Sequence, residues 1–91
     1  MEFYYTMNRI YALNEKGDTI AEITFPPMDK DTVNIDHTFV DDSLRGQGVA
    51  GKLMLAAAES LRRSGKKAVP TCSYAQAWFE KHPEFADILK K

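Results

Sequence analysis

The chain has 91 residues, of which 44% are hydrophobic and 27% charged, and its formal net charge is −1. This length predicts one domain over residues 1–91 with a modest core, and the near-neutral charge argues against nucleic-acid binding, which needs a clustered basic surface. The single cysteine, Cys72, favours a reducing compartment, and no apolar run has the length of a signal peptide or a membrane span, so we expect a soluble cytoplasmic protein.

Residues 9–14 and 19–25 are rich in β-branched and aromatic residues, and turn-forming residues lie between them. This pattern predicts a β-hairpin. Pro26 and Pro27 end the second strand, because proline has no N–H for a ladder. Residues 32–40 predict a third strand. Its alternating side chains are expected to put four residues on one face, namely Val33, Ile35, His37 and Phe39.

Apolar residues at helical spacing predict an amphipathic helix over residues 49–63 that ends at Gly65. Its apolar stripe comprises Val49, Ala50, Leu53, Met54, Ala57, Ala58 and Leu61. Residues 67–71 predict a short strand parallel to the third. Ser73 can cap a second helix that runs to about His82, where Pro83 ends it, and we expect a short final helix over residues 84–89. The order β-β-β-α-β-α predicts an α+β fold, with a mostly antiparallel sheet and one parallel βαβ crossover.

The segment RGQGVAGK lies between the third strand and the first helix. The first amides of a helix lack internal partners and lie at the positive end of its dipole, so a glycine-lined helix start predicts a site for phosphate oxygens. The spacing Gly46-x-Gly48-x-x-Gly51 matches the dinucleotide-binding fingerprint, but no carboxylate follows about 20 residues later for the ribose. The P-loop alternative needs Ser or Thr after Lys52, where Leu53 stands.

The run from Arg45 to Ala50 agrees with the signature Arg/Gln-x-x-Gly-x-Gly/Ala, and with it the sequence resembles the GNAT-type N-acetyltransferase superfamily from about Arg9 to Leu89. The resemblance is greatest to the very small single-domain branch sometimes called YjdJ-like, and it includes the segments 70–72 and 82–85. It implies an acetyl-coenzyme A-dependent N-acetyltransferase that acts on an amine of a small molecule or a protein. No metal is expected.

The resemblance also implies how the coenzyme is held. The backbone N–H groups that would face its pyrophosphate are those of Gln47, Gly48, Val49, Ala50 and Gly51. Gly46 and Gly48 allow close approach because they have no Cβ. Arg45 and Lys52 are expected to add charge-assisted contacts to phosphate oxygens.

Along the preceding strand, the resemblance implies that the pantetheine arm bonds the main chain of Phe39 and Val40, whose side chains we expect in the core. Three side chains are candidates for the chemistry. His37 can accept a proton near the cleft, Cys72 can accept an acetyl group transiently or line the channel, and Tyr74 can protonate the departing thiolate. Each of the three also fits a purely structural role.

Carboxylates near the loop add two hypotheses: Asp41 and Asp42 can orient Arg45, and Asp41 or Glu22 can act as a base. Typical superfamily members carry further N-terminal helices and C-terminal strands that help build the acceptor site, and this sequence has neither. The alternative function is therefore a non-catalytic module that binds acetyl-coenzyme A. The edge of the short last strand can pair between copies, so we expect a monomer or a weak homodimer.

Overall fold

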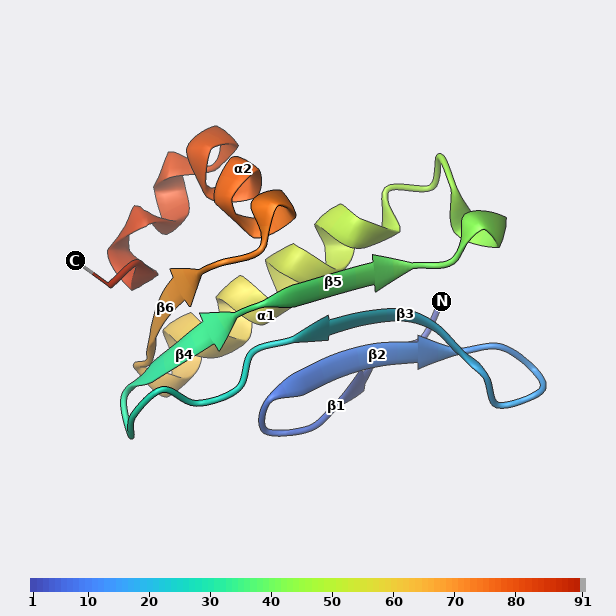
Figure 1. Cartoon of the computed structure of the whole chain (residues 1–91), viewed down its shortest axis with the longest axis horizontal. Helices are drawn as coiled ribbons and strands as arrows, with labels where there is room; N and C mark the ends of the chain where they lie inside the picture. The colour runs from blue at the N-terminus through green and yellow to red at the C-terminus, as the bar shows by residue number, and fades with distance from the viewer. Residues whose placement is uncertain (91) are drawn as a thin grey trace.

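The computed structural model describes residues 1–90. Four antiparallel strands form one sheet in the order β1-β2-β3-β5 (Figure 1). Their bounds are Tyr4–Tyr5 for β1, Arg9–Leu13 for β2, Thr19–Thr24 for β3 and His37–Val40 for β5. The β2–β3 hairpin is present as predicted. Its turn is closed by the Asn14 side-chain oxygen, which accepts the N–H groups of Lys16 at 2.9 Å and Asp18 at 3.0 Å.

Asp36 divides the predicted third strand into two strands that pair with different neighbours. Before it, β4 (Thr32–Ile35) pairs in parallel with β6 (Lys67–Pro70), and after it β5 pairs antiparallel with β3. The fold class is confirmed, since the sheet is mostly antiparallel and the parallel pair β4–β6 is connected through α1, the helix Val49–Ser64. The crossover, however, belongs to a separate two-stranded sheet.

The division at Asp36 also changes which side chains face the core. Val33 and Ile35 are buried as expected, but His37 and Phe39 are exposed, so the prediction that these four residues share a face is wrong. One residue outside both ladders shifts the two-residue alternation by one position. The half-buried residues of β5 are therefore Thr38 and Val40.

The helix α1 covers one face of the antiparallel sheet and lies behind it in Figure 1. Six of its seven predicted stripe residues are buried, and Ala50 is half-buried. The helix ends at Gly65, whose φ of +74° allows its N–H to donate to the Arg62 carbonyl at 3.2 Å. The apolar face of α1 therefore forms the central contact between the sheet and the rest of the core.

The second helix, α2, spans Ser73–Lys81 and follows β6 directly. Its N-cap is Cys72 rather than the predicted Ser73, because the Cys72 Sγ accepts the Ala75 N–H at 3.3 Å. The remaining elements are two 3-10 helices, η1 over Asp42–Leu44 and η2 over Pro83–Ile88. The second of these corresponds to the predicted last helix.

The end of the described chain lies along the outer edge of β6. Leu89 forms a parallel bridge with Ala68, and the Lys90 N–H donates to the Ala68 carbonyl at 2.9 Å. The edge that was expected to pair between copies is thus occupied at this point by the chain itself. Within residues 1–90, no helix has the length and apolar character needed to cross a bilayer.

Candidate functional site

The strand β5 has an open edge beside the end of β6. The last main-chain hydrogen bonds between the β6 segment and the chain that leads into β5 run from the N–H groups of Thr71 and Cys72 to the Ile35 carbonyl. The chain then turns into α2, whereas β5 continues beside β3, so the two strands separate. The Asp41 N–H donates to the Ile20 carbonyl at 2.8 Å, so the main chain of residue 41 faces β3. In an antiparallel ladder, the main-chain groups of alternate residues point to the same side, so residue 39 also faces β3. The N–H and C=O groups of residues 38 and 40 therefore point to the open side.

This geometry gives the predicted pair Phe39 and Val40 different surroundings. The main chain of Phe39 faces β3, and its side chain is 39% exposed, so the expectation that it lies in the core is wrong. Val40 is half-buried against the core and directs its main chain to the open edge. Thr38 offers the other main-chain groups on that edge. Sequence reasoning did not select it, because the shift at Asp36 has no signal in the residue order.

The start of α1 carries several backbone N–H groups that have no partner within residues 1–90. They belong to Gly48, Val49, Ala50 and Gly51, and the first helical bond runs from the Lys52 N–H to the Gly48 carbonyl at 3.1 Å. No side chain caps this end. Free donors at the positive end of a 16-residue helix are the donor set that a phosphate needs.

Two glycines leave the space in front of these amides open. Gly46 and Gly48 have φ values of +84° and +68°, and a β-carbon added to either would meet nothing within 4 Å. The Gln47 N–H differs from its neighbours, because it donates to the Leu44 carbonyl at 3.3 Å. The residues at the helix start thus fit a diphosphate group, with the amides of residues 48–51 as the available donors.

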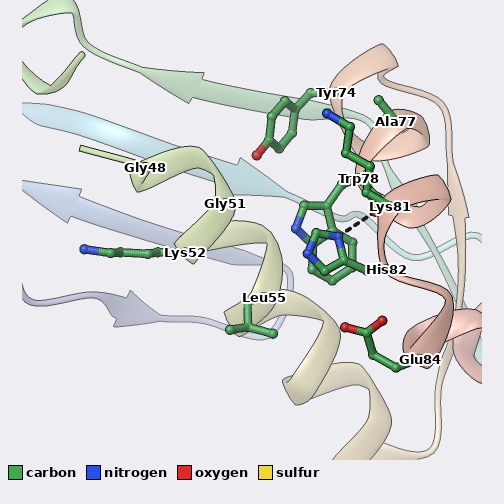
Figure 2. Close-up of a pocket in the computed structure, with 10 residues that line it drawn as sticks. All are labelled: Gly48, Gly51, Lys52, Leu55, Tyr74, Ala77, Trp78, Lys81, His82 and Glu84. Carbon is green, nitrogen blue, oxygen red and sulfur yellow. Dashed lines mark hydrogen bonds between the residues drawn. The ribbon is translucent and has the colours of Figure 1, made fainter. Parts of the chain in front are cut away.

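The charged residues of the loop lie at the surface. Arg45 pairs with Asp42 at 2.9 Å, and both side chains are at least 80% exposed. Asp41 accepts the Ser43 N–H at 3.0 Å and thereby caps η1. The Ser43 side chain, and after it this N–H, lower the pKa of Asp41 by hydrogen bonding to its carboxylate, which is the opposite of what a general base at neutral pH requires. Lys52 is exposed, and Figure 2 shows its amino group pointing away from α2.

A cavity of about 480 Å³ lies between α1 and α2 (Figure 2). Its walls are formed by Gly48, Gly51, Lys52, Leu55, Tyr74, Ala77, Trp78, Lys81, His82 and Glu84. At the end away from Gly48, the Trp78 and His82 rings stack with centroids 4.0 Å apart, and His82 Nδ1 lies 2.8 Å from the Trp78 carbonyl oxygen. Of the α2 part of this wall, sequence reasoning selected Tyr74 and missed the other members, although all four recur at positions i, i+3, i+4 and i+7, a spacing that marks one helix face.

The three predicted catalytic side chains do not form one group. Cys72 is half-buried, and its Sγ lies 3.6 Å from the Thr38 hydroxyl across the gap beside β5. Tyr74 follows on the first turn of α2. His37 lies on the opposite face of β5, with its side chain 55% exposed and its Nε2 3.6 Å from Glu22 Oε1. The alternation along β5 therefore puts Thr38, not His37, beside Cys72.

Tyr74 has the protonation state that a proton donor needs. Burial raises the pKa of its hydroxyl above the ordinary 10.0, and the neighbouring Cys72 raises it further. The phenol therefore carries its proton at neutral pH. Within residues 1–90, no three His, Cys, Asp or Glu side chains gather as metal ligands.

Comparison with known proteins shows that the sequence of this chain is similar to one protein family. The sequence profile of the family described as GCN5-related N-acetyl-transferase matches residues 9–88. Protein NATD1 of Xenopus tropicalis is 35% identical over 63 residues, which are 69% of this chain and 58% of that protein. The chain thus spans less than two thirds of the length of this relative.

Solved structures show the same similarity. The solution structure of a GCN5-like candidate N-acetyltransferase from Staphylococcus aureus is 36% identical, has a TM-score of 0.80, and the match covers 98% of this chain and 87% of that one. The GNAT family N-acetyltransferase YhbS from Escherichia coli, in complex with CoA, is 28% identical with a TM-score of 0.60 over 68% of this chain and 38% of its own.

Proposed function

The chain belongs to the GCN5-related N-acetyltransferase family, and on this basis we propose that it transfers the acetyl group of acetyl-coenzyme A to a primary amine. The observation that carries the proposal is the set of free amides from Gly48 to Gly51, a segment whose two end residues line the cavity between α1 and α2. The coenzyme complex of the Escherichia coli relative supports the choice of donor. Membership of the small YjdJ-like branch stays a prediction.

In this proposal, the start of α1 binds the diphosphate of the coenzyme. The four free amides donate to its oxygens, and the open space in front of Gly46 and Gly48 admits them. Arg45 can add a charge-assisted contact, because its exposed pair with Asp42 is worth little and exchanges readily for a phosphate. Lys52 supplies a further positive charge on the same turn.

The open edge of β5 provides the next contact. The main-chain groups of Thr38 and Val40 on this edge can bond an extended amide-bearing arm in the way that an added strand would. An arm placed there brings its thioester into the gap where Cys72 lies 3.6 Å from Thr38. Tyr74 follows Cys72 on the first turn of α2, and its side chain lines the cavity between α1 and α2.

The transfer itself needs a neutral amine and a proton for the leaving sulfur. The amine nitrogen attacks the thioester carbonyl carbon, the C–N bond forms, and the C–S bond breaks. Tyr74 gives its phenolic proton to the thiolate and regains one from solvent, and the proton that the nitrogen loses passes to His37 or to water. Cys72 either takes the acetyl group first, as a thioester that the amine then cleaves, or lines the channel.

Calorimetric titration with acetyl-coenzyme A, followed by an assay of thiol release, tests the proposal. We expect saturable binding and thiol release that depends on an added amine. Absence of binding at millimolar coenzyme would refute both the transferase and any coenzyme-binding role. Binding without amine-dependent thiol release would favour the non-catalytic module.

A further inference from the structure

The face of the antiparallel sheet that turns away from α1 carries a row of side chains paired across four strands. The register sets Tyr4 opposite Tyr11, Tyr11 opposite Glu22, and Glu22 opposite Phe39. Residues directly opposite one another share a face, with Cβ atoms about 5 Å apart. Tyr4 and Phe39 are 41% and 39% exposed, so this row is an open surface.

One half of the row already holds a cation. The guanidinium carbon of Arg9 lies 3.8 Å from the centroid of the Tyr11 ring, and the Arg9 Nε donates to Glu22 Oε2. An aromatic face attracts a cation through its quadrupole, and a carboxylate accepts its N–H groups in charge-assisted hydrogen bonds. On this side of Glu22, a positive group is therefore held between a ring and a carboxylate.

The other half offers the same two partners. Phe39 lies on the far side of Glu22 from Tyr11, and within residues 1–90 no cationic side chain lies over its ring. Glu22 Oε1 is directed to this side, where it lies 3.6 Å from His37 Nε2, beyond hydrogen-bond distance. We infer that Glu22 Oε1, Phe39 and His37, here called the open half-site, bind the primary alkylammonium group of the acetyl acceptor.

An ammonium group suits these partners better than a second guanidinium. It is compact, and its three N–H donors can reach Glu22 Oε1 and the imidazole Nε2 of a neutral His37 at once. The methylenes next to the nitrogen can lie on the Phe39 ring. A neutral amide lacks the charge, and an anionic group would face the Glu22 carboxylate.

The half-site lies on the same strand, β5, beside which the proposed function places the thioester, so this step of the inference rests on the proposed function. Thr38, which lies between His37 and Phe39 in sequence, occupies the other face of β5 and is 3.6 Å from Cys72. The bound ammonium gives one proton to His37 Nε2. The resulting amine then reaches the thioester over the open edge of β5, the C–N bond forms as the C–S bond breaks, and the second proton that the nitrogen loses passes to water.

Nuclear magnetic resonance titration of the ¹⁵N-labelled chain tests the inference, with and without coenzyme A. The probes are diaminobutane, a peptide with one lysine and a blocked N-terminus, and the same peptide with its lysine acetylated. We expect the first two to shift the amides of Glu22 and Phe39, and the acetylated peptide to leave them unchanged. A response to diaminobutane alone or to the peptide alone identifies the source of the ammonium.

Matched variants distinguish amine binding at the open half-site from a general effect of negative charge on amine binding. Glu22→Gln should weaken amine binding, and raise the amine KM of an active protein, by about tenfold, the loss expected for one charge-assisted hydrogen bond. Phe39→Leu should weaken it about threefold. Asp36→Asn removes the same charge from a neighbouring exposed residue, whose carboxylate is bonded to Thr24, and should change amine binding less than twofold.

The outcomes distinguish this inference from the proposed function. Amide shifts at Glu22 and Phe39 without coenzyme binding would support the half-site and reject the transferase. Coenzyme binding and turnover with equal amine affinity in Glu22→Gln and the parent protein would reject the half-site alone. Amine-induced shifts confined to other strands would reject it too.

Discussion

A β-carbon built on Gly51 would lie 3.6 Å from the hydroxyl oxygen of Tyr74. This distance is an ordinary van der Waals contact, so α1 and α2 approach each other here with room for a methyl group. Both residues line the cavity between the helices, on its side nearest the free amides (Figure 2). Their separation therefore sets how closely the two helices approach each other beside the free amides.

Two substitutions at Gly51 should have different effects, one on the stability of the protein and the other on coenzyme binding. Gly51 has no positive φ, so Gly51→Ala should raise the free energy of unfolding by about 0.5–1 kcal/mol through the higher helix propensity of alanine. Gly51→Leu should displace Tyr74 and weaken acetyl-coenzyme A binding about tenfold or more. Urea unfolding and calorimetry measure the two effects. Unchanged affinity in Gly51→Leu would mean that the coenzyme does not pass between α1 and α2.

Gly48 and Gly65 form a matched pair at the two ends of α1, with φ values of +68° and +74°. Alanine at either position should cost about 1–2 kcal/mol of stability, because a β-carbon is strained in the left-handed region. Only Gly48→Ala should also weaken acetyl-coenzyme A binding, since only Gly48 adjoins the free amides. Equal coenzyme affinity in the two variants, measured by calorimetry, would contradict the assignment of the diphosphate site.

Tyr74→Phe should lower kcat by about a hundredfold, the usual contribution of a positioned acid, while the coenzyme Kd stays unchanged. The pKa of Tyr74 is raised above 10.0, so the protonated form that the reaction uses persists up to that pH and is lost only above it. The pH–rate profile of the parent protein should therefore show no loss of activity from Tyr74 between neutral pH and pH 10.0. An unchanged kcat in Tyr74→Phe would assign the proton donation to another group or to water.

Cys72 has two separable roles, as N-cap of α2 and as a thiol. Cys72→Ala should cost about 1 kcal/mol, because the Ala75 N–H loses its acceptor, whereas Cys72→Ser keeps a capping oxygen and most of the stability. If the thiol carries the acetyl group, both variants lose turnover, and mass spectrometry of the parent protein with acetyl-coenzyme A finds an adduct on Cys72. Full activity in Cys72→Ser would limit the residue to capping and channel lining.

Arg62 links η2 to α1, and its ion pair makes the stability of the protein depend on pH in the acid range. Its side chain pairs with Asp87, donates to the Glu84 carbonyl at 2.6 Å, and lies 4.2 Å from the Phe85 ring centroid. The hydrogen bond from Arg62 lowers the pKa of Asp87 below 3.8, so its stabilising effect is present above that pH and is lost as the pH falls through the lowered pKa. Asp87→Asn should therefore have a lower Tm than the parent protein at neutral pH.

That difference in Tm should shrink as the pH falls below 3.8 and through the lowered pKa of Asp87, where the parent carboxylate becomes protonated and loses its charge. Arg45→Gln is the control, because its pair with Asp42 is fully at the surface and contributes little to stability. Its Tm should stay close to that of the parent protein across the same pH range. A difference for Asp87→Asn that does not depend on pH would show that packing, rather than the ion pair, is responsible.

The order of residues was sufficient for local features whose cause lies in the chain itself. The spacing of apolar residues predicted α1 and its buried face, Gly65 predicted its end, and Pro83 the end of α2, because helical periodicity and backbone freedom act over a few residues. The glycine-rich segment predicted a helix start with open amides for the same reason. A family resemblance was then needed to choose the ligand.

Only the tertiary structure decided which face of β5 each side chain occupies and which edge is open. Asp36 ends one ladder and begins another, and this choice of partners depends on β3 and β6, which lie far from it in sequence. It placed Thr38 beside Cys72, moved His37 and Phe39 to the opposite face, and set Glu22 between two aromatic rings. Strand pairing is a non-local interaction, so a pattern of alternating residues groups side chains only within an unbroken strand, and it shows neither where the strand is interrupted nor which face turns to the core.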